Sequence, residues 1–229
     1  MARLLTTFIV ALVSVQLTTA AGPGTGGDVL AQMTPGTADG WSLAYANGLT
    51  PTFTLSASGA GVSASDTADT HTSWYFVGPP AFSGDMKGAY NGKLSFNIVH
   101  MAVADAQAKK ELKEPLVILQ AMCGHSLWWS SGKQTSDQTT VMLNEDAGWV
   151  DSRTGKAAGV LDMLGVLSHL SHIKIRGGFF KTSAETTRLS SVQVVASGKS
   201  WFPCCTLTNE VCLLPLRIHT HMHIYIPVA

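Results

Sequence analysis

The stretch of residues 74–98 constrains the fold more than any other part of the sequence. It contains two runs of aromatic and branched apolar residues, Trp74–Val77 and Leu94–Ile98, of the kind that fits a pleated sheet. Turn-forming residues lie between the runs, among them the pair Asn91-Gly92. In the second run apolar and polar residues alternate, which predicts a strand with one buried and one solvated face.

Short motifs follow one another in this stretch: aromatic-Phe-Val-x-Pro, then Phe-x-Gly-Asp, then Tyr-x-Gly-x-Leu-Ser-Phe. Downstream, Leu-x-Glu-x-x-Gly-Trp occupies 143–149 and Ile-x-Ile-Arg-Gly occupies 173–177. In this order the motifs resemble those of the laminin IV type A (laminin B) domain. The residues of the first three motifs are Tyr75, Phe76, Val77, Pro79, Phe82, Gly84, Asp85, Tyr90, Gly92, Leu94, Ser95 and Phe96.

The resemblance implies the fold class and the compartment. It covers residues 40–197 and implies an all-β fold, an antiparallel jelly-roll β-sandwich with one or two short helices in the connections. It also implies an extracellular protein that is not an enzyme. Laminins carry this domain among cysteine-rich repeats similar to epidermal growth factor, and this sequence has none, so we expect a stand-alone secreted member.

The two ends of the chain differ from this central part. Residues 1–21 are predicted to be a signal peptide, because Arg3 precedes a short apolar run that ends in small residues. Residues 22–39 are predicted to be a flexible lead-in, and residues 198–229 an atypical tail outside the domain. No later stretch is long enough for a membrane helix. The 15 basic residues balance the 15 acidic ones, and this neutral net charge disfavours nucleic acid as a partner.

The remaining elements follow from local pattern. Helices are predicted at 102–114, from helix-forming residues, and at 159–171, from the spacing of apolar residues. Residues 56–73 are predicted to be a loop with at most one weak strand. The buried faces of the strands predict a core that contains Phe76, Leu94, Phe96, Ile118, Leu143, Ile173 and Ile175.

A metal site has weak candidates at the C-terminus. His219, His221 and His223 would share one face of a strand, and Cys204, Cys205 and Cys212 lie nearby. The cysteine spacing fits no usual zinc pattern, so we predict no metal and no cofactor. Three other histidines, His125, His169 and His172, have no carboxylate at a useful sequence spacing and are predicted to be ordinary residues.

Hydrolase chemistry has little support in the sequence. There is no Gly-x-Ser-x-Gly motif. Asp85 and Glu145 could in principle form the carboxylate pair of a glycosidase, but nothing favours them over carboxylates that stabilise turns.

Trp128 and Trp129 are the candidate ligand-binding residues. They are adjacent in a predicted strand, so their side chains must point to opposite faces of the sheet. The outward indole either stacks on a sugar or is covered by a loop.

Arg176 is the candidate structural clamp. It follows an apolar strand and is expected to be partly buried, which requires a carboxylate or carbonyl partner. Asp85 is the predicted partner.

The function that these observations predict is a secreted, non-catalytic extracellular module with a structural, adhesive or matrix-associated role. The alternatives are a carbohydrate-binding module, and a glycan-active enzyme or its accessory domain. The expected partner is an extracellular protein or glycan.

Overall fold

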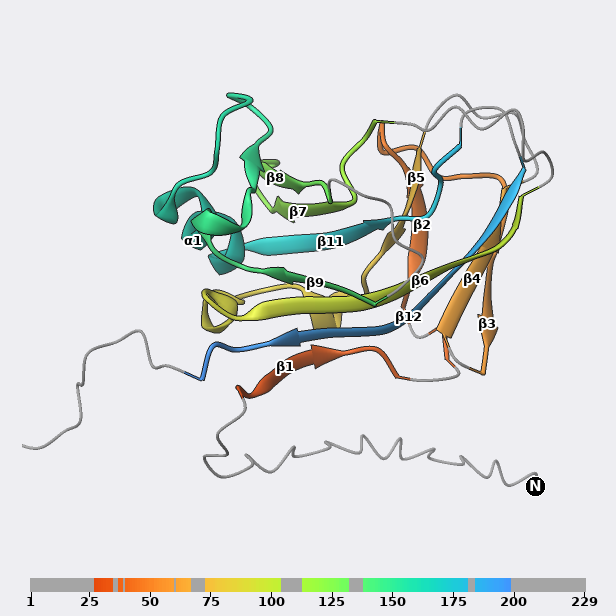
Figure 1. The fold of residues 1–229 in the computed structure, drawn as a ribbon, viewed down its shortest axis with the longest axis horizontal. Coiled ribbons are helices and arrows are strands. Elements are labelled where there is room, and N and C mark those ends of the chain that lie inside the picture. Colours follow the sequence, from red (N-terminus) through yellow and green to blue (C-terminus); the bar gives the residue numbers. More distant parts are fainter. Residues whose placement is uncertain are drawn as a thin grey trace, which may run out of the picture. The chain divides into compact units, whose positions relative to one another are not determined.

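The computed structural model describes residues 27–34, 37–38, 40–59, 61–66, 73–103, 113–131, 138–180 and 184–198. The predicted signal peptide, the three C-terminal cysteines and His219, His221 and His223 lie outside these residues. The described strands form two antiparallel six-stranded sheets that lie over one another as layers (Figure 1). This confirms the predicted β-sandwich.

Sheet A contains the longest strands. Its order is β3 (Leu55–Ser58), β4 (Gly61–Ser65), β12 (Glu185–Val195), β6 (Lys93–Val103) and β9 (Gln138–Met142), and β1 (Val29–Gln32) also pairs with β12. Strand β6 contains the alternating run found in the sequence, and it pairs with β12 on one side and β9 on the other.

Sheet B forms the second layer. Its order is β10 (Val150–Asp151), β8 (Ser126–Trp129), β7 (Val117–Ala121), β11 (Leu170–Arg176), β5 (Trp74–Val77) and β2 (Ser42–Tyr45). Three short 3₁₀ helices among the described residues lie in connections: η1 (Pro80–Phe82), η2 (Lys87–Ala89) and η3 (Glu145–Ala147).

The core lies between the sheets, where alternate residues of each strand meet. Six of the seven predicted core residues are buried there; the exception is Ile118. Strand β7 is nearly continuous in apolar residues, so its sequence does not reveal which face is buried. Val117, Leu119 and Ala121 point inward, and Ile118 therefore lies on the outer face, half-buried.

The one α-helix of the described residues, α1 (Val160–Ser168), lies against β7 and β8. Its buried face holds Met163, Val166 and Leu167. Of the apolar residues whose spacing predicts the helix, Leu161 is 83% exposed, and Val160 and Leu164 are half-buried, so the predicted face is only partly correct. The helix is shorter than predicted because Leu170 already belongs to β11. The predicted helix at 102–114 is wrong at its start, since Ala102 and Val103 continue β6, and residues 104–112 lie outside the described part.

Strands β1 and β10 were not predicted, and β4 was predicted only as at most one weak strand. Strand β1 lies in the expected lead-in, so that part of the chain belongs to sheet A. Strand β4 lies in the stretch predicted as a loop with at most one weak strand, and there Val62 and Ala64 point into the core while small polar residues point outward. Small residues give a weak alternating pattern, which explains why the sequence indicates β4 only weakly.

No described helix has the length and apolar character needed to cross a membrane.

Candidate functional site

The paired tryptophans lie in β8 and face opposite sides of sheet B, as predicted. Trp129 points inward with Leu127; its indole nitrogen donates a 2.9 Å hydrogen bond to the Ala147 carbonyl, and its ring packs near that of Trp149. Trp128 points outward and is 40% exposed. The described residues therefore leave one indole open to solvent within a strand of the sheet.

A row of side chains crosses sheet B at the level of Trp128. The strand register places Val150 of β10 and Ile118 of β7 on either side of the indole, and Lys174 of β11 beyond Ile118. Val150 and Ile118 are half-buried, so the indole continues an apolar strip on the outer face.

A second row runs beside the first and is polar. The register aligns Ser126 of β8 with Gln120 of β7, and Gln120 with His172 of β11. The indole thus has hydroxyl, amide and imidazole groups on one side. We refer to the two rows together as the Trp128 face: Val150, Trp128, Ile118, Lys174, Ser126, Gln120 and His172.

Burial shifts the pKa of both basic groups of this face. It lowers the pKa of the Lys174 ammonium. It also lowers the pKa of His172, and the Lys174 charge adds to that effect. An indole with hydroxyl and amide groups beside it suits a ligand with both apolar and hydroxyl-bearing surfaces, such as a sugar ring or a polar loop of a protein.

The predicted pairing of Arg176 with Asp85 is wrong. Arg176 is buried, as expected, but its guanidinium donates to the Glu114 carbonyl and lies 4.4 Å from the centre of the Phe179 ring. Asp85 is exposed and pairs with Lys87 at 3.0 Å, which holds the pKa of the Asp85 carboxyl below its usual value. The turn that contains Asp85 satisfies this carboxylate locally.

The carboxylates considered for hydrolysis have separate partners. Glu145 accepts a 2.6 Å hydrogen bond from the Tyr90 hydroxyl, and this bond lowers the pKa of Glu145. Asp85 is held by Lys87 instead. Each carboxylate therefore has a structural role.

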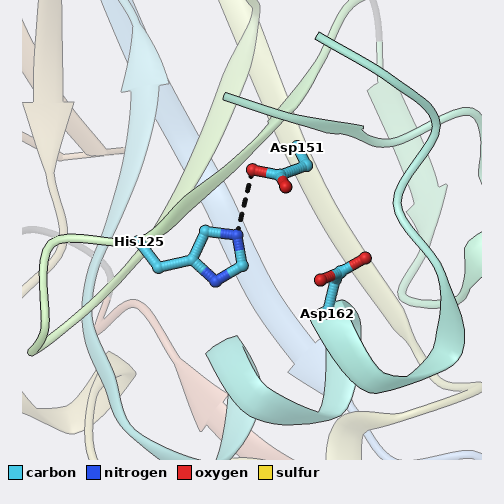
Figure 2. Close-up of side chains that lie close together, drawn as sticks. All are labelled: His125, Asp151 and Asp162. Atoms are coloured by element: carbon cyan, nitrogen blue, oxygen red, sulfur yellow. Dashed lines mark hydrogen bonds and ion pairs between the residues drawn. The ribbon is translucent and has the colours of Figure 1, made fainter. Parts of the chain in front are cut away.

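A second cluster, not predicted from the sequence, joins His125, Asp151 and Asp162. The three side chains point toward one another from the turn before β8, from β10 and from the first turn of α1 (Figure 2). Nε2 of His125 lies 3.1 Å from Oδ1 of Asp151. The prediction that His125 has no carboxylate partner is wrong, because the pairing of β10 with β8 brings Asp151 to it from 26 positions away.

A comparison with known protein families agrees with the sequence motifs found in sheets A and B. Residues 75–200, more than half of the chain, match the family Laminin B (Domain IV). The chain belongs to this family.

Among solved structures, the L4b domain of human laminin alpha-2 is similar to this chain. It is 14% identical with a TM-score of 0.57, and the match covers 74% of this chain and 98% of that chain. A family 11 carbohydrate-binding module of a cellulosomal cellulase of Clostridium thermocellum is 14% identical with a TM-score of 0.44, covering 76% of this chain and 96% of that chain. A comparison with curated protein sequences gives no match.

Proposed function

We propose that this laminin IV domain is a secreted, non-catalytic module that binds an extracellular partner through the Trp128 face, with a structural, adhesive or matrix-associated role. The observation that carries the proposal is the 40% exposure of Trp128 within a strand of sheet B. Exposed aromatic side chains with polar neighbours are favoured at binding surfaces, because the ring contributes a large apolar area while its surroundings stay wet. The N-terminal sequence supports secretion.

A carbohydrate-binding module is the second candidate function. The observation that favours it is the row of Ser126, Gln120 and His172 beside the indole, which offers uncharged hydrogen-bonding groups at the edge of a flat ring. A sugar presents an apolar ring face and hydroxyl groups at its rim, so the two rows would meet the two kinds of surface. A protein partner would use the same indole as a central apolar contact.

Replacing Trp128 with Ala tests the binding face. The variant should bind the partner found on a glycan array or a panel of matrix proteins at least about tenfold more weakly, which corresponds to about 1.4 kcal/mol. Its melting temperature should stay close to that of the wild type, because the lost ring is exposed. Titration of each variant, with a thermal melt alongside, measures both quantities.

Two further variants serve as controls. Met142→Ala removes a side chain of similar exposure, 43%, from β9 of the other sheet and should leave affinity unchanged. Trp129→Ala should mainly destabilise the fold, by about 3–5 kcal/mol if the indole is tightly packed. Unchanged affinity of Trp128→Ala for every partner found would refute the proposed face. The kind of partner retained distinguishes an adhesive from a carbohydrate-binding function.

Secretion is tested separately. Expression of the full chain in a eukaryotic secretory system should deliver the protein to the medium with an N-terminus near Gly22. Replacing two residues of the apolar run, Leu12→Asp and Val15→Asp, should retain it inside the cell. N-terminal sequencing of the protein in the medium provides the measurement, and a product that still begins at Met1 would contradict the expected cleavage.

A further inference from the structure

We propose that His125, Asp151 and Asp162 form a binding site for a single transition-metal ion, of which zinc is the best fit. Each residue offers one ligand atom, and the three atoms lie within 4.8 Å of one another. The residues come from the turn before β8, from β10 and from α1, so the fold brings them together (Figure 2). None of these residues belongs to the Trp128 face, although His125 and Asp151 adjoin Ser126 and Val150 in sequence, and the proposal does not depend on the proposed binding function.

The distances suit a small tetrahedral ion. Zinc bonds of roughly 2.0–2.2 Å to imidazole nitrogen and carboxylate oxygen place two ligands of a tetrahedron about 3.3–3.5 Å apart. His125 Nε2 and Asp151 Oδ1 are 3.1 Å apart, close to that separation. An ion between them would replace the present hydrogen bond, and a small side-chain rotation would bring the Asp162 carboxylate to the third position. Water would fill the fourth.

Two of the ligands are held in place by their surroundings. The side chain of His125 is 12% exposed and that of Asp151 is 5% exposed. Asp151 also accepts hydrogen bonds from the Arg153 backbone N–H at 2.9 Å and from the Thr154 hydroxyl at 3.2 Å. Such secondary hydrogen bonds orient metal-binding carboxylates and reduce the entropy lost on binding.

The third ligand keeps an oxygen for the ion. Oδ2 of Asp162 accepts a 3.0 Å hydrogen bond from the Gly159 N–H at the start of α1. This bond anchors the side chain on the side of the helix that faces His125, while the second carboxylate oxygen has no such role. Arg153 is the competing cation: its Nε lies 3.6 Å from Asp151 Oδ1, but its side chain is 63% exposed and can turn into solvent.

The imidazole determines which metals fit. Calcium and magnesium prefer sites built from oxygen ligands, and calcium takes six to eight of them. One imidazole with two carboxylates suits zinc and related divalent transition metals. A bound ion would connect β10 to α1 and to the start of β8, and would fix the edge strand whose Val150 lies beside Trp128.

The test uses the full chain with all its C-terminal cysteines and histidines, so that any metal they bind is the same in every variant. Protein is stripped with chelator, incubated with zinc chloride and freed of excess metal by gel filtration. The wild type should retain one more zinc ion per chain than Asp162→Asn, by elemental analysis. Added zinc should raise the melting temperature of the wild type more than that of the variant, and affinity at this site should fall at least about tenfold.

Asp162→Asn keeps an oxygen that can accept the Gly159 N–H, so helix α1 should remain capped and the variant should fold. His125→Gln should lose the same ion, whereas the matched controls Asp146→Asn and His169→Gln should keep it; these two residues are exposed and lie outside the cluster. Equal zinc content and equal melting shifts in the wild type and Asp162→Asn would overturn the proposal. Stabilisation by calcium chloride instead of zinc, lost in Asp162→Asn, would overturn the assignment of the metal.

Discussion

Gly177 is a position where the fold has no room for a side chain. A Cβ atom built there would lie 2.0 Å from the Trp74 ring, and one built on Gly178 would lie 2.5 Å from it. The N–H groups of both glycines donate to the Trp74 carbonyl, at 2.8 and 3.0 Å. The backbone after β11 therefore wraps around a fully buried tryptophan of the neighbouring strand β5. This close contact explains why the Ile-x-Ile-Arg-Gly motif ends in a glycine at position 177.

Replacing Gly177 with Ala should destabilise the protein by about 1–3 kcal/mol, because the added methyl group must displace a buried indole. Urea unfolding followed by tryptophan fluorescence measures the change. Gly165→Ala is the matched control: no atom lies within 4 Å of its Cβ position in α1, and Ala is the better helix former, so this change should stabilise by about 0.5–1 kcal/mol. A Gly177→Ala variant as stable as the wild type would show that Trp74 can move.

The paired tryptophans show what the sequence could and could not predict at this scale. Strand geometry alone required that Trp128 and Trp129 face opposite sides. It could not say which one is outward, because that depends on Leu127 and Trp149, which fill the core beside Trp129. The partner of Arg176 was predicted wrongly for a similar reason: the Glu114 carbonyl reaches it from another part of the fold.

At the scale of elements, the Tyr90–Glu145 hydrogen bond connects two motif segments. Tyr90 follows η2 and Glu145 begins η3, and the backbone reinforces the connection through Leu143 N–H to the Gly92 carbonyl and Asn91 N–H to the Leu143 carbonyl. The two segments that resemble the family in sequence thus form one hydrogen-bonded unit at the start of β6.

Tyr90→Phe should reduce stability at neutral pH by about 1–2 kcal/mol, since a hydrogen bond to a charged carboxylate is lost. The bond lowers the pKa of Glu145, so its contribution is present above the carboxyl's unfolded pKa and is lost as pH falls through the lower, folded pKa. The stability difference between wild type and variant should therefore shrink in acid. A double-mutant cycle with Glu145→Gln, measured by urea unfolding, isolates the pair; a coupling energy near zero would show that the bond adds nothing.

Strand elements were predictable where large side chains alternate, as in β6, and where turns bound an apolar run, as in β5. The sequence indicates β4 only weakly because its inward residues are small. The prediction of Ile118 in the core is wrong because β7 begins with apolar residues on both faces. The cluster of His125 with Asp151 was missed because it depends on the pairing of β8 with β10, which no local spacing reveals.

At the scale of the whole molecule, the two sheets meet around a buried carboxylate. Glu185 of β12 in sheet A is 2% exposed, and its Oε1 accepts hydrogen bonds from the backbone N–H groups of Phe179 and Phe180, which follow β11 of sheet B. Burial raises the pKa of Glu185 to about 7, although these two hydrogen bonds act in the opposite direction. The junction between the layers therefore contains a group that titrates near neutral pH.

The raised pKa makes stability depend on pH in a defined direction. The folded state holds the Glu185 proton more tightly than the unfolded chain, whose carboxyl has a pKa near 4.5. The stabilisation is complete below that value and is lost as pH rises through about 7. Between pH 5 and pH 8 the wild type should lose on the order of 2–3 kcal/mol from this group.

Glu185→Gln should remove this dependence, because the amide keeps an oxygen for the Phe179 and Phe180 N–H groups and does not titrate. Melting temperatures of both proteins at intervals from pH 5 to pH 8 measure the effect. The difference between the two curves cancels the histidines that do not contact Glu185. His100 does not cancel, because its Nδ1 lies 3.8 Å from the Glu185 carboxylate, and it belongs to the measured effect. Asp85→Asn is the control: the pKa of this exposed carboxyl is lowered, so it titrates only in acid and the slope from pH 5 to pH 8 should remain. Parallel curves for the wild type and Glu185→Gln would mean that Glu185 stays charged at the junction of the sheets.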